Sequence, residues 1–210
     1  MPLYKTIECC PGTRLLVWKI TESHDQLQGQ VSLNQHSLSR LANMKSELHR
    51  RGFMSVRMLL QSVGYSDFDL YYDQFGKPHL KDGTHISITH SFEFSALILS
   101  DRKIGIDIEL RRTLVAKLAD KFIDSEFAYL DPKNLEDYIS RLTVIWGVKE
   151  AIFKIRNEVG ISFKDHIEVA PFEMKEGKAS ATLHFQSLSL TFPVFFEEFE
   201  NFTLVYVLDN

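Results

Sequence analysis

Two carboxylates stand in a short apolar run near the middle of the chain. Asp107 and Glu109 are two residues apart in IGIDIEL at 104–110. On a β-strand, residues two apart leave the same face, so these acids are expected to share one face while isoleucines occupy the other. Because two like charges are costly to bury, the pair is expected either at a solvated sheet edge or around a cation.

A second polar group has helical spacing. In WGVKEAIFK at 146–154, Trp146, Glu150 and Lys154 are four residues apart, so they share one face of a helix. This face could simply carry an exposed ion pair, which would contribute only about 0.3–0.5 kcal/mol. An acid and a base are nevertheless aligned, opposite an apolar stripe.

These motifs occur in an order that is typical of one family. GIDIE at 105–109 is followed by W-x-x-K-E-x-x-x-K at 146–154 and preceded by FGKP at 75–78 and SITHS at 87–91. The combination resembles the 4′-phosphopantetheinyl transferase family over about residues 50–155, although Thr89 stands where the family usually has serine. The length of 210 residues is similar to the two-lobed Sfp type rather than to the shorter, trimeric AcpS type.

The resemblance implies an enzyme that moves the phosphopantetheine arm of coenzyme A to a serine of an apo acyl or peptidyl carrier protein. The other product would be adenosine 3′,5′-bisphosphate. Such a transfer depends mainly on positioning and charge neutralisation. Three carboxylates without a histidine or cysteine ligand set favour Mg²⁺ over Zn²⁺.

Catalytic roles follow from the same resemblance. Asp107 and Glu109 are expected to bind Mg²⁺, and Asp107 is expected to be essential for turnover. Glu150 is expected to bind the metal or to act as general base for the acceptor serine. Lys154 is expected to contact the pyrophosphate of coenzyme A as a point charge, with Lys149 in a supporting role.

The upstream motifs are expected to contact the rest of coenzyme A. The resemblance implies that His90 binds a phosphate, with a hydroxyl from Thr89, and that the turn at 75–78 approaches the adenine, because glycine has no Cβ. In HRRGFMSVR at 49–57, Arg51 and Arg57 correspond to the family residues that contact the 3′-phosphate, a group that suits guanidinium donors. The alternative interpretation of this basic stretch is a solvated helix face. The residues of the turn are Phe75, Gly76, Lys77 and Pro78.

The surrounding sequence must position these residues. Apolar periodicity predicts a helix or two over 35–63 and helices over 114–130 and 135–155. Strands are predicted at 15–20, in three runs over 85–110 with a hairpin turn at 101–103, and repeatedly after Gly160, and a loop is predicted at 73–79. The pattern indicates an α+β protein with lobes at 1–105 and 106–210, and the resemblance implies a pseudo-twofold arrangement of two similar lobes.

Composition excludes several functional classes. The formal charge is −4 and no long basic tract occurs, which disfavours nucleic-acid binding. No stretch has the roughly 18 apolar residues of a membrane span. Cys9 and Cys10 are adjacent, so an unstrained disulfide between them is not expected, and a reducing, cytoplasmic setting is predicted.

The two-lobed pattern also leads to expectations about the oligomeric state and the protein partner. A chain with two lobes is expected to be a monomer. An acidic carrier protein is expected to dock on apolar residues of the second lobe, with Phe122 or Phe127 as candidates, although aromatic residues at helical spacing are usually core. The alternative functions are a non-catalytic coenzyme A-binding or regulatory protein and a metal-dependent phosphohydrolase.

Overall fold

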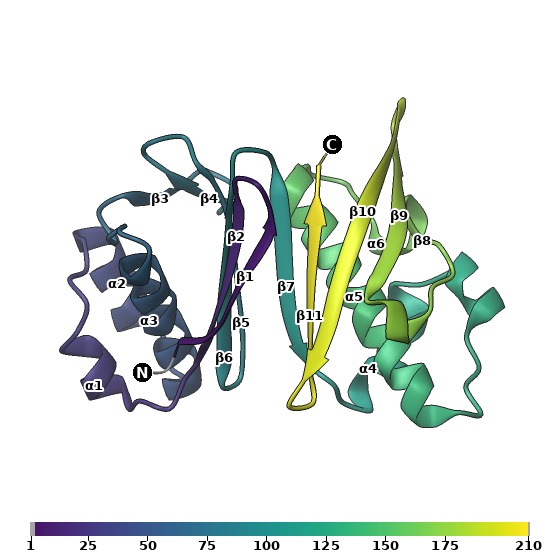
Figure 1. Ribbon diagram of the computed structural model, residues 1–210, viewed down its shortest axis with the longest axis horizontal. Helices are drawn as coiled ribbons and strands as arrows, with labels where there is room; N and C mark the ends of the chain where they lie inside the picture. The colour runs from purple at the N-terminus through teal and green to yellow at the C-terminus, as the bar shows by residue number, and fades with distance from the viewer. Residues whose placement is uncertain (1–2, 210) are drawn as a thin grey trace. The chain divides into compact units, whose positions relative to one another are not determined.

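The computed structural model describes residues 3–209, which form two compact units that divide between Arg102 and Lys103. Each unit has a hydrophobic core of its own. Each also combines helices with antiparallel strands (Figure 1). The α+β class predicted from the sequence is confirmed. The predicted lobe boundary at 105/106 falls inside β7 (Ile104–Leu110), so the division lies three residues earlier.

The N-terminal unit is built on a four-stranded sheet with the order β1-β2-β6-β5. Helix α3 packs against β2, β5 and β6 and shares a core with them. The periodic segment at 35–63 forms two helices, because Asn34 and Ser46 each cap a helix start through a side-chain oxygen. The elements are β1 (Leu3–Cys10), β2 (Thr13–Lys19), α1 (His24–Gln28), α2 (Gln35–Asn43), α3 (Glu47–Ser62), β3 (Leu70–Tyr72), β4 (Pro78–Leu80), β5 (His85–Ser91) and β6 (Phe94–Ser100).

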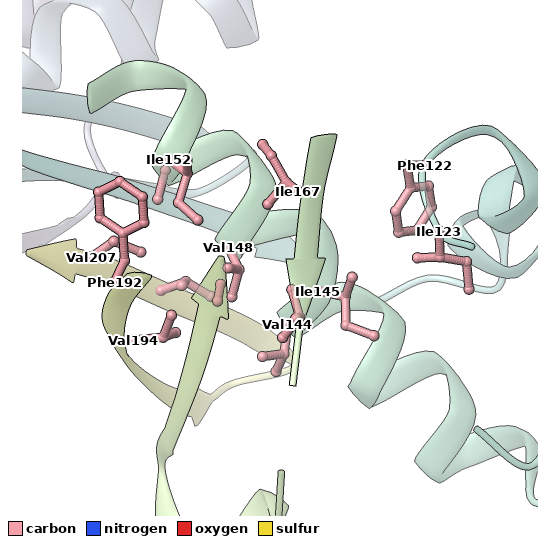
Figure 2. Close-up of a cluster of buried hydrophobic side chains, with 14 of the residues drawn as sticks. Phe122, Ile123, Val144, Ile145, Val148, Ile152, Ile167, Phe192, Val194 and Val207 are labelled. Atoms are coloured by element: carbon pink, nitrogen blue, oxygen red, sulfur yellow. The ribbon is translucent and has the colours of Figure 1, made fainter. Parts of the chain in front are cut away.

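The C-terminal unit is built on a five-stranded sheet with the order β7-β11-β10-β9-β8. Helix α5 packs along β7 and β11. Val148 and Ile152 of α5 share the core with Phe192 and Val207 of the strands (Figure 2). The elements after β7 are α4 (Leu114–Leu118), η1 (Ala119–Lys121), η2 (Ser125–Tyr129), α5 (Leu135–Arg156), α6 (Phe163–His166), β8 (Ile167–Val169), η3 (Met174–Glu176), β9 (Lys178–Phe185), β10 (Leu188–Phe199) and β11 (Phe202–Leu208).

The segment at 114–130 does not form the single helix that its periodicity predicts. It contains the short helix α4 and two 3₁₀ turns, η1 and η2, with a non-helical backbone at Asp124 (φ −140°, ψ −81°). The break allows Glu126 to turn inward, where its carboxylate accepts hydrogen bonds from the amides of Asp124 and Val169. A buried polar contact therefore overrides local helix propensity.

The predicted hairpin turn at 101–103 is also wrong. Residues 101–103 connect β6 to β7, but these strands belong to different sheets. β7 begins the second unit and lies at one edge of its sheet, next to β11. Within the described part of the chain, no helix combines the length and the apolar composition needed to cross a bilayer.

Candidate active site

The two strand acids lie on β7, as their spacing predicts. Asp107 is paired with Val205 of β11, and Glu109 is paired with Thr203. On the other face of the strand, Ile106 is fully buried. Asp107 is itself only 5% exposed, so the alternative of a solvated edge pair does not describe this residue.

Two glycines allow helix α5 to lie directly on the acid-bearing face. A Cβ at Gly105 would stand 2.0 Å from the backbone oxygen of Ala151. A Cβ at Gly147 would stand 2.7 Å from Cγ2 of Val205 and 3.8 Å from Oδ2 of Asp107. Since real Cβ atoms do not come within 3.0 Å of other atoms, the distances of 2.0 and 2.7 Å mean that a larger residue would push the helix away from the strand. The glycines therefore help to bring the helical motif onto the strand motif.

Lys154 joins the two motifs. Its ammonium nitrogen lies 2.8 Å from Oδ1 of Asp107 and donates to the backbone oxygen of Ile106, also at 2.8 Å. The side chain of Lys154 is 28% exposed, whereas that of Asp107 is 6% exposed. Lys154 is therefore the more solvent-exposed partner in its ion pair with the buried carboxylate of Asp107.

The carboxylates of the site act on one another. Burial is the main cause that raises the pKa of Glu109 to about 7, followed by the negative charges of Asp107 and Glu150. A hydrogen bond from Trp146 and the charge of Lys154 oppose this rise in the pKa. Burial also raises the pKa of Glu150, again with a contribution from Asp107 and opposition from Lys154. Three acids and one ammonium thus share one electrostatic environment.

The donor chemistry of this site fits a hard cation. Asp107, Glu109 and Glu150 offer only carboxylate oxygens, which Mg²⁺ prefers. With the side chains as they stand, no group of three histidine, cysteine or acidic residues within 3–209 has a metal-holding arrangement, and Asp107 is paired with Lys154. The residue types and the mutual repulsion therefore fit Mg²⁺, whereas the present side-chain positions place an ammonium on Asp107.

An apolar pocket of about 150 Å³ borders Glu109. Trp146 connects the two regions, because its indole hydrogen-bonds to Glu109 and its ring lines the pocket. The ring contacts Phe122 and Phe163 at centroid distances of 5.1 and 5.5 Å. The pocket is lined by Glu109, Leu110, Arg112, Leu114, Val115, Leu118, Phe122, Thr143 and Trp146.

Lys149 precedes Glu150, but its contacts are those of a buried residue that stabilises the fold. It is fully buried, and its ammonium nitrogen lies 2.7 Å from Oε1 of Glu126. It also donates to the backbone oxygens of Phe122 and Phe163. Burial lowers the pKa of Lys149, and Glu126 opposes that change. The sequence did not reveal Glu126 as its partner, since nothing in the local periodicity marks an inward-facing acid at this position.

The two aromatic candidates for carrier docking differ in exposure. Phe122 is 1% exposed and packs in the core, which is the alternative expected for aromatic residues at helical spacing. Phe127 is 41% exposed and stays a candidate.

In the N-terminal unit, His90 lies beside the basic helix α3. A Cβ at Gly52 would stand 3.0 Å from Cγ and Nδ1 of the His90 ring. The centroids of the His49 and His90 rings are 6.3 Å apart. His90 is exposed, whereas Thr89 is 7% exposed and, by strand alternation, leaves the opposite face. The two side chains therefore leave different faces of β5, and their predicted roles in binding coenzyme A stay predictions.

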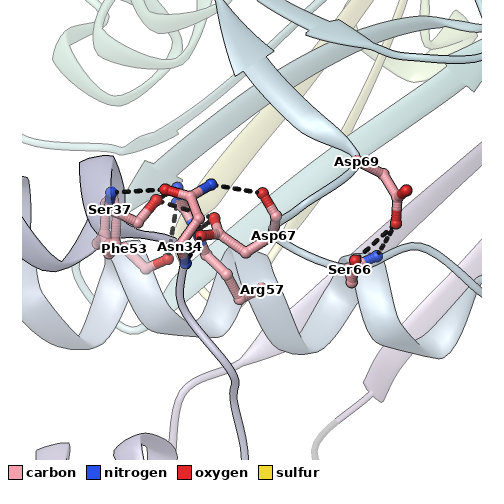
Figure 3. Close-up of polar contacts among 7 residues, drawn as sticks. All are labelled: Asn34, Ser37, Phe53, Arg57, Ser66, Asp67 and Asp69. Atoms are coloured by element: carbon pink, nitrogen blue, oxygen red, sulfur yellow. Dashed lines mark hydrogen bonds and ion pairs between the residues drawn. The ribbon is translucent and has the colours of Figure 1, made fainter.

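Arg57 has a different role from the one predicted. It is 2% exposed, and its Nε lies 2.8 Å from Oδ1 of Asp67. Its remaining nitrogens donate to the backbone oxygen of Phe53 and to the hydroxyl of Ser37, as Figure 3 shows. A guanidinium buried in this way cannot face the 3′-phosphate of a ligand, so the prediction for Arg57 is wrong.

Arg51 is half-buried on α3 and donates to the backbone oxygens of Ile20 and Glu22. These contacts anchor this part of α3 to the segment that follows β2. Its predicted contact with the 3′-phosphate stays a prediction.

The turn at 73–79 is built around Asp73. One oxygen of its carboxylate accepts hydrogen bonds from the amides of Phe75 and Lys77. Gly76 has φ +84°, a left-handed conformation that favours glycine, and Pro78 begins β4. Phe75 is 59% exposed and is therefore accessible to a planar ligand. Its contact with adenine stays a prediction.

Comparisons with known proteins agree with the C-terminal geometry. Residues 103–205 match the model of the 4′-phosphopantetheinyl transferase superfamily. The 4′-phosphopantetheinyl transferase gsp of Aneurinibacillus migulanus is 30% identical over 39% of this chain and 35% of its own length. The 4′-phosphopantetheinyl transferase Sfp of Bacillus subtilis (strain 168) is 24% identical over 63% of each chain, and ffp of Bacillus subtilis is 25% identical over the same share. The matches thus span 35–63% of the lengths of these relatives. Residues 103–205 of the chain are therefore similar to the 4′-phosphopantetheinyl transferase superfamily.

Proposed function

We propose that this protein transfers the 4′-phosphopantetheine arm of coenzyme A to a serine of an apo carrier protein in a Mg²⁺-dependent reaction. The observation that supports this most is the environment of Asp107, where Lys154 forms an ion pair and the charges of Glu109 and Glu150 act nearby. The relatives named as 4′-phosphopantetheinyl transferases support the same reaction.

The proposed chemistry uses the acids and the lysine differently. Asp107 and Glu109 would hold Mg²⁺, which when bound would neutralise pyrophosphate charge. Glu150 would accept the proton of the acceptor serine, since a raised pKa makes its carboxylate a stronger base. The serine oxygen forms a bond to the β-phosphorus, and the bond from that phosphorus to the bridging pyrophosphate oxygen breaks. Adenosine 3′,5′-bisphosphate leaves with that oxygen.

Lys154 would exchange partners during binding. Its ammonium now contacts Asp107, and it would contact a pyrophosphate oxygen of coenzyme A when Asp107 serves as a metal ligand. In the N-terminal unit, we propose that Arg51 and His90 bind phosphate of coenzyme A. The turn that contains Phe75, Gly76, Lys77 and Pro78 would contact the adenine.

The direct test is mass spectrometry of apo carrier proteins after incubation with the protein, coenzyme A and Mg²⁺. We expect a carrier to gain one phosphopantetheine group, and we expect the gain to disappear with chelator or with the Asp107→Ala variant. A panel of acyl and peptidyl carriers that gains no mass would contradict the proposal. If the protein still bound coenzyme A, that result would support a non-catalytic binding protein.

A further inference from the structure

The apolar pocket beside Glu109 is not used by the chemistry described above. Its walls include Leu114, Val115 and Leu118, and its volume is about 150 Å³. An apolar cavity of about this size can hold a ligand as large as benzene. The pocket is therefore suited to a compact hydrocarbon group that lies close to the carboxylates.

The proposed substrate has such a group next to its reacting phosphorus. In coenzyme A, the β-phosphorus is joined through an oxygen and a methylene to a carbon that bears two methyl groups. Adenosine 3′,5′-bisphosphate, the proposed second product, lacks this branched unit. We propose that the pocket binds the dimethyl carbon of the pantoyl unit, an inference that rests on the proposed function and specifies how that same site recognises its substrate.

Trp146 explains why the pocket and the acids would act together. Its indole binds Glu109 while its ring forms part of the pocket wall. The ring also contacts Phe122, which lines the same pocket, and Phe163. A branched group packed against this ring would hold the adjacent phosphorus near the carboxylates, so apolar recognition would contribute to positioning.

The pocket can be narrowed without a change in any acid. Leu114 is 46% exposed at the rim, so Leu114→Trp can add volume with little disturbance of the core. Leu135 is 54% exposed at the start of α5 and does not line the pocket. Leu135→Trp is therefore a matched control, and Val115→Phe narrows the pocket from a second position.

The measurement is calorimetric titration of each folded variant with coenzyme A and with adenosine 3′,5′-bisphosphate. We expect Leu114→Trp and Val115→Phe to weaken coenzyme A binding about tenfold, which is the effect expected for losing the burial of two methyl groups. Binding of adenosine 3′,5′-bisphosphate should change by less than about twofold, and Leu135→Trp should change neither affinity. Thermal unfolding of each variant shows whether the fold is retained.

Three results would overturn the inference. An equal loss of affinity for both ligands would indicate a general disturbance of the site. Unchanged affinity for coenzyme A in both pocket variants would show that the pocket does not bind the pantoyl unit. A higher KM for the carrier protein with unchanged coenzyme A affinity would assign the pocket to a carrier side chain. If the unaltered protein bound neither ligand, the proposed function itself would fail, and this result differs from all three outcomes for the pocket variants.

Discussion

Glu150 and Lys154 are one helical turn apart, but their environments suit different tasks. Lys154 contacts Asp107 directly, whereas burial and the charge of Asp107 raise the pKa of Glu150. These environments follow from short-range spacing on α5 and β7, which is why the sequence could predict that these side chains share faces. The partner of each side chain depends on how the helix lies on the strand, which the spacing alone does not define.

The role of Glu150 can be tested by Glu150→Gln. If Glu150 is the general base, turnover should fall about 10²–10⁴-fold because the amide cannot accept the proton. The Mg²⁺ concentration for half-maximal binding should then change by less than about twofold, measured by titration in the presence of coenzyme A. Glu136→Gln, an exposed change in the first turn of α5, is the control. A large rise in the Mg²⁺ requirement would instead identify Glu150 as a metal ligand.

Substitutions of Arg51 and Arg57 in α3 should separate stability from ligand binding. Arg57→Met leaves Asp67 buried without its charged partner, so the free energy of unfolding should fall by about 3–5 kcal/mol. Arg51→Met should instead weaken binding of coenzyme A about tenfold or more, because a charge-assisted contact is lost. Urea unfolding and calorimetry measure the two effects. The assignment would be contradicted if the Arg57 variant kept its stability and lost affinity.

Residue types alone did not separate these arginines. Both occur in one basic stretch, and the partner of Arg57 is Asp67, ten residues further on and beyond the end of α3. Thr89 and Phe122 illustrate the same limit, since strand alternation and core packing decide their positions. The sequence did predict that Asp107 and Glu109 share one face of a strand, because that depends only on local backbone geometry.

At the scale of elements, the contact between α5 and β7 positions the site. We expect Gly105→Ala to lower the free energy of unfolding by about 3 kcal/mol, since its Cβ would collide with the backbone of Ala151. Gly29→Ala is a matched control, because Gly29 has φ −69° and a Cβ there would meet its nearest atom at 3.6 Å. The control should change stability by less than about 0.5 kcal/mol. Equal urea midpoints for the two variants would contradict this role of Gly105.

The buried ion pair of Lys149 and Glu126 connects α5 to the irregular segment before it. Lys149→Met should cost about 3–5 kcal/mol of unfolding free energy, because Glu126 would stay buried without its counter-charge. Lys117→Met, a change at an exposed lysine of α4, should cost less than about 0.5 kcal/mol. Chemical denaturation compares them. A small effect of Lys149→Met would show that Glu126 becomes neutral or hydrated at little cost.

The same pair explains why the helix predicted over 114–130 was wrong. Its apolar spacing favoured one helix, but Glu126 must reach Lys149 and the amide of Val169. These partners are 23 and 43 residues away in the sequence, so local periodicity could not reveal them. By contrast, the helix expected at 135–155 agrees with α5 within one residue at its C-terminal end, because its apolar stripe and its packing require the same conformation.

At the scale of the whole molecule, one chain contains two units with separate cores. The sequence analysis placed the lobes at 1–105 and 106–210 because each half combines helices with strands, whereas the two units divide between Arg102 and Lys103. Since each unit buries its own apolar residues, we expect the protein to be a monomer in solution. Static light scattering should give the mass of one chain over a tenfold range of concentration, and a constant trimer mass would contradict this expectation.

The position of Trp146 also gives the molecule a built-in optical reporter. The chain has two tryptophans, and Trp18 belongs to the core of the other unit. In a Trp18→Phe variant, the emission would come from one indole that contacts both Glu109 and the apolar pocket. Its wavelength and intensity should therefore respond when a cation or a ligand changes the field at that carboxylate, so that occupancy can be followed in real time without a label.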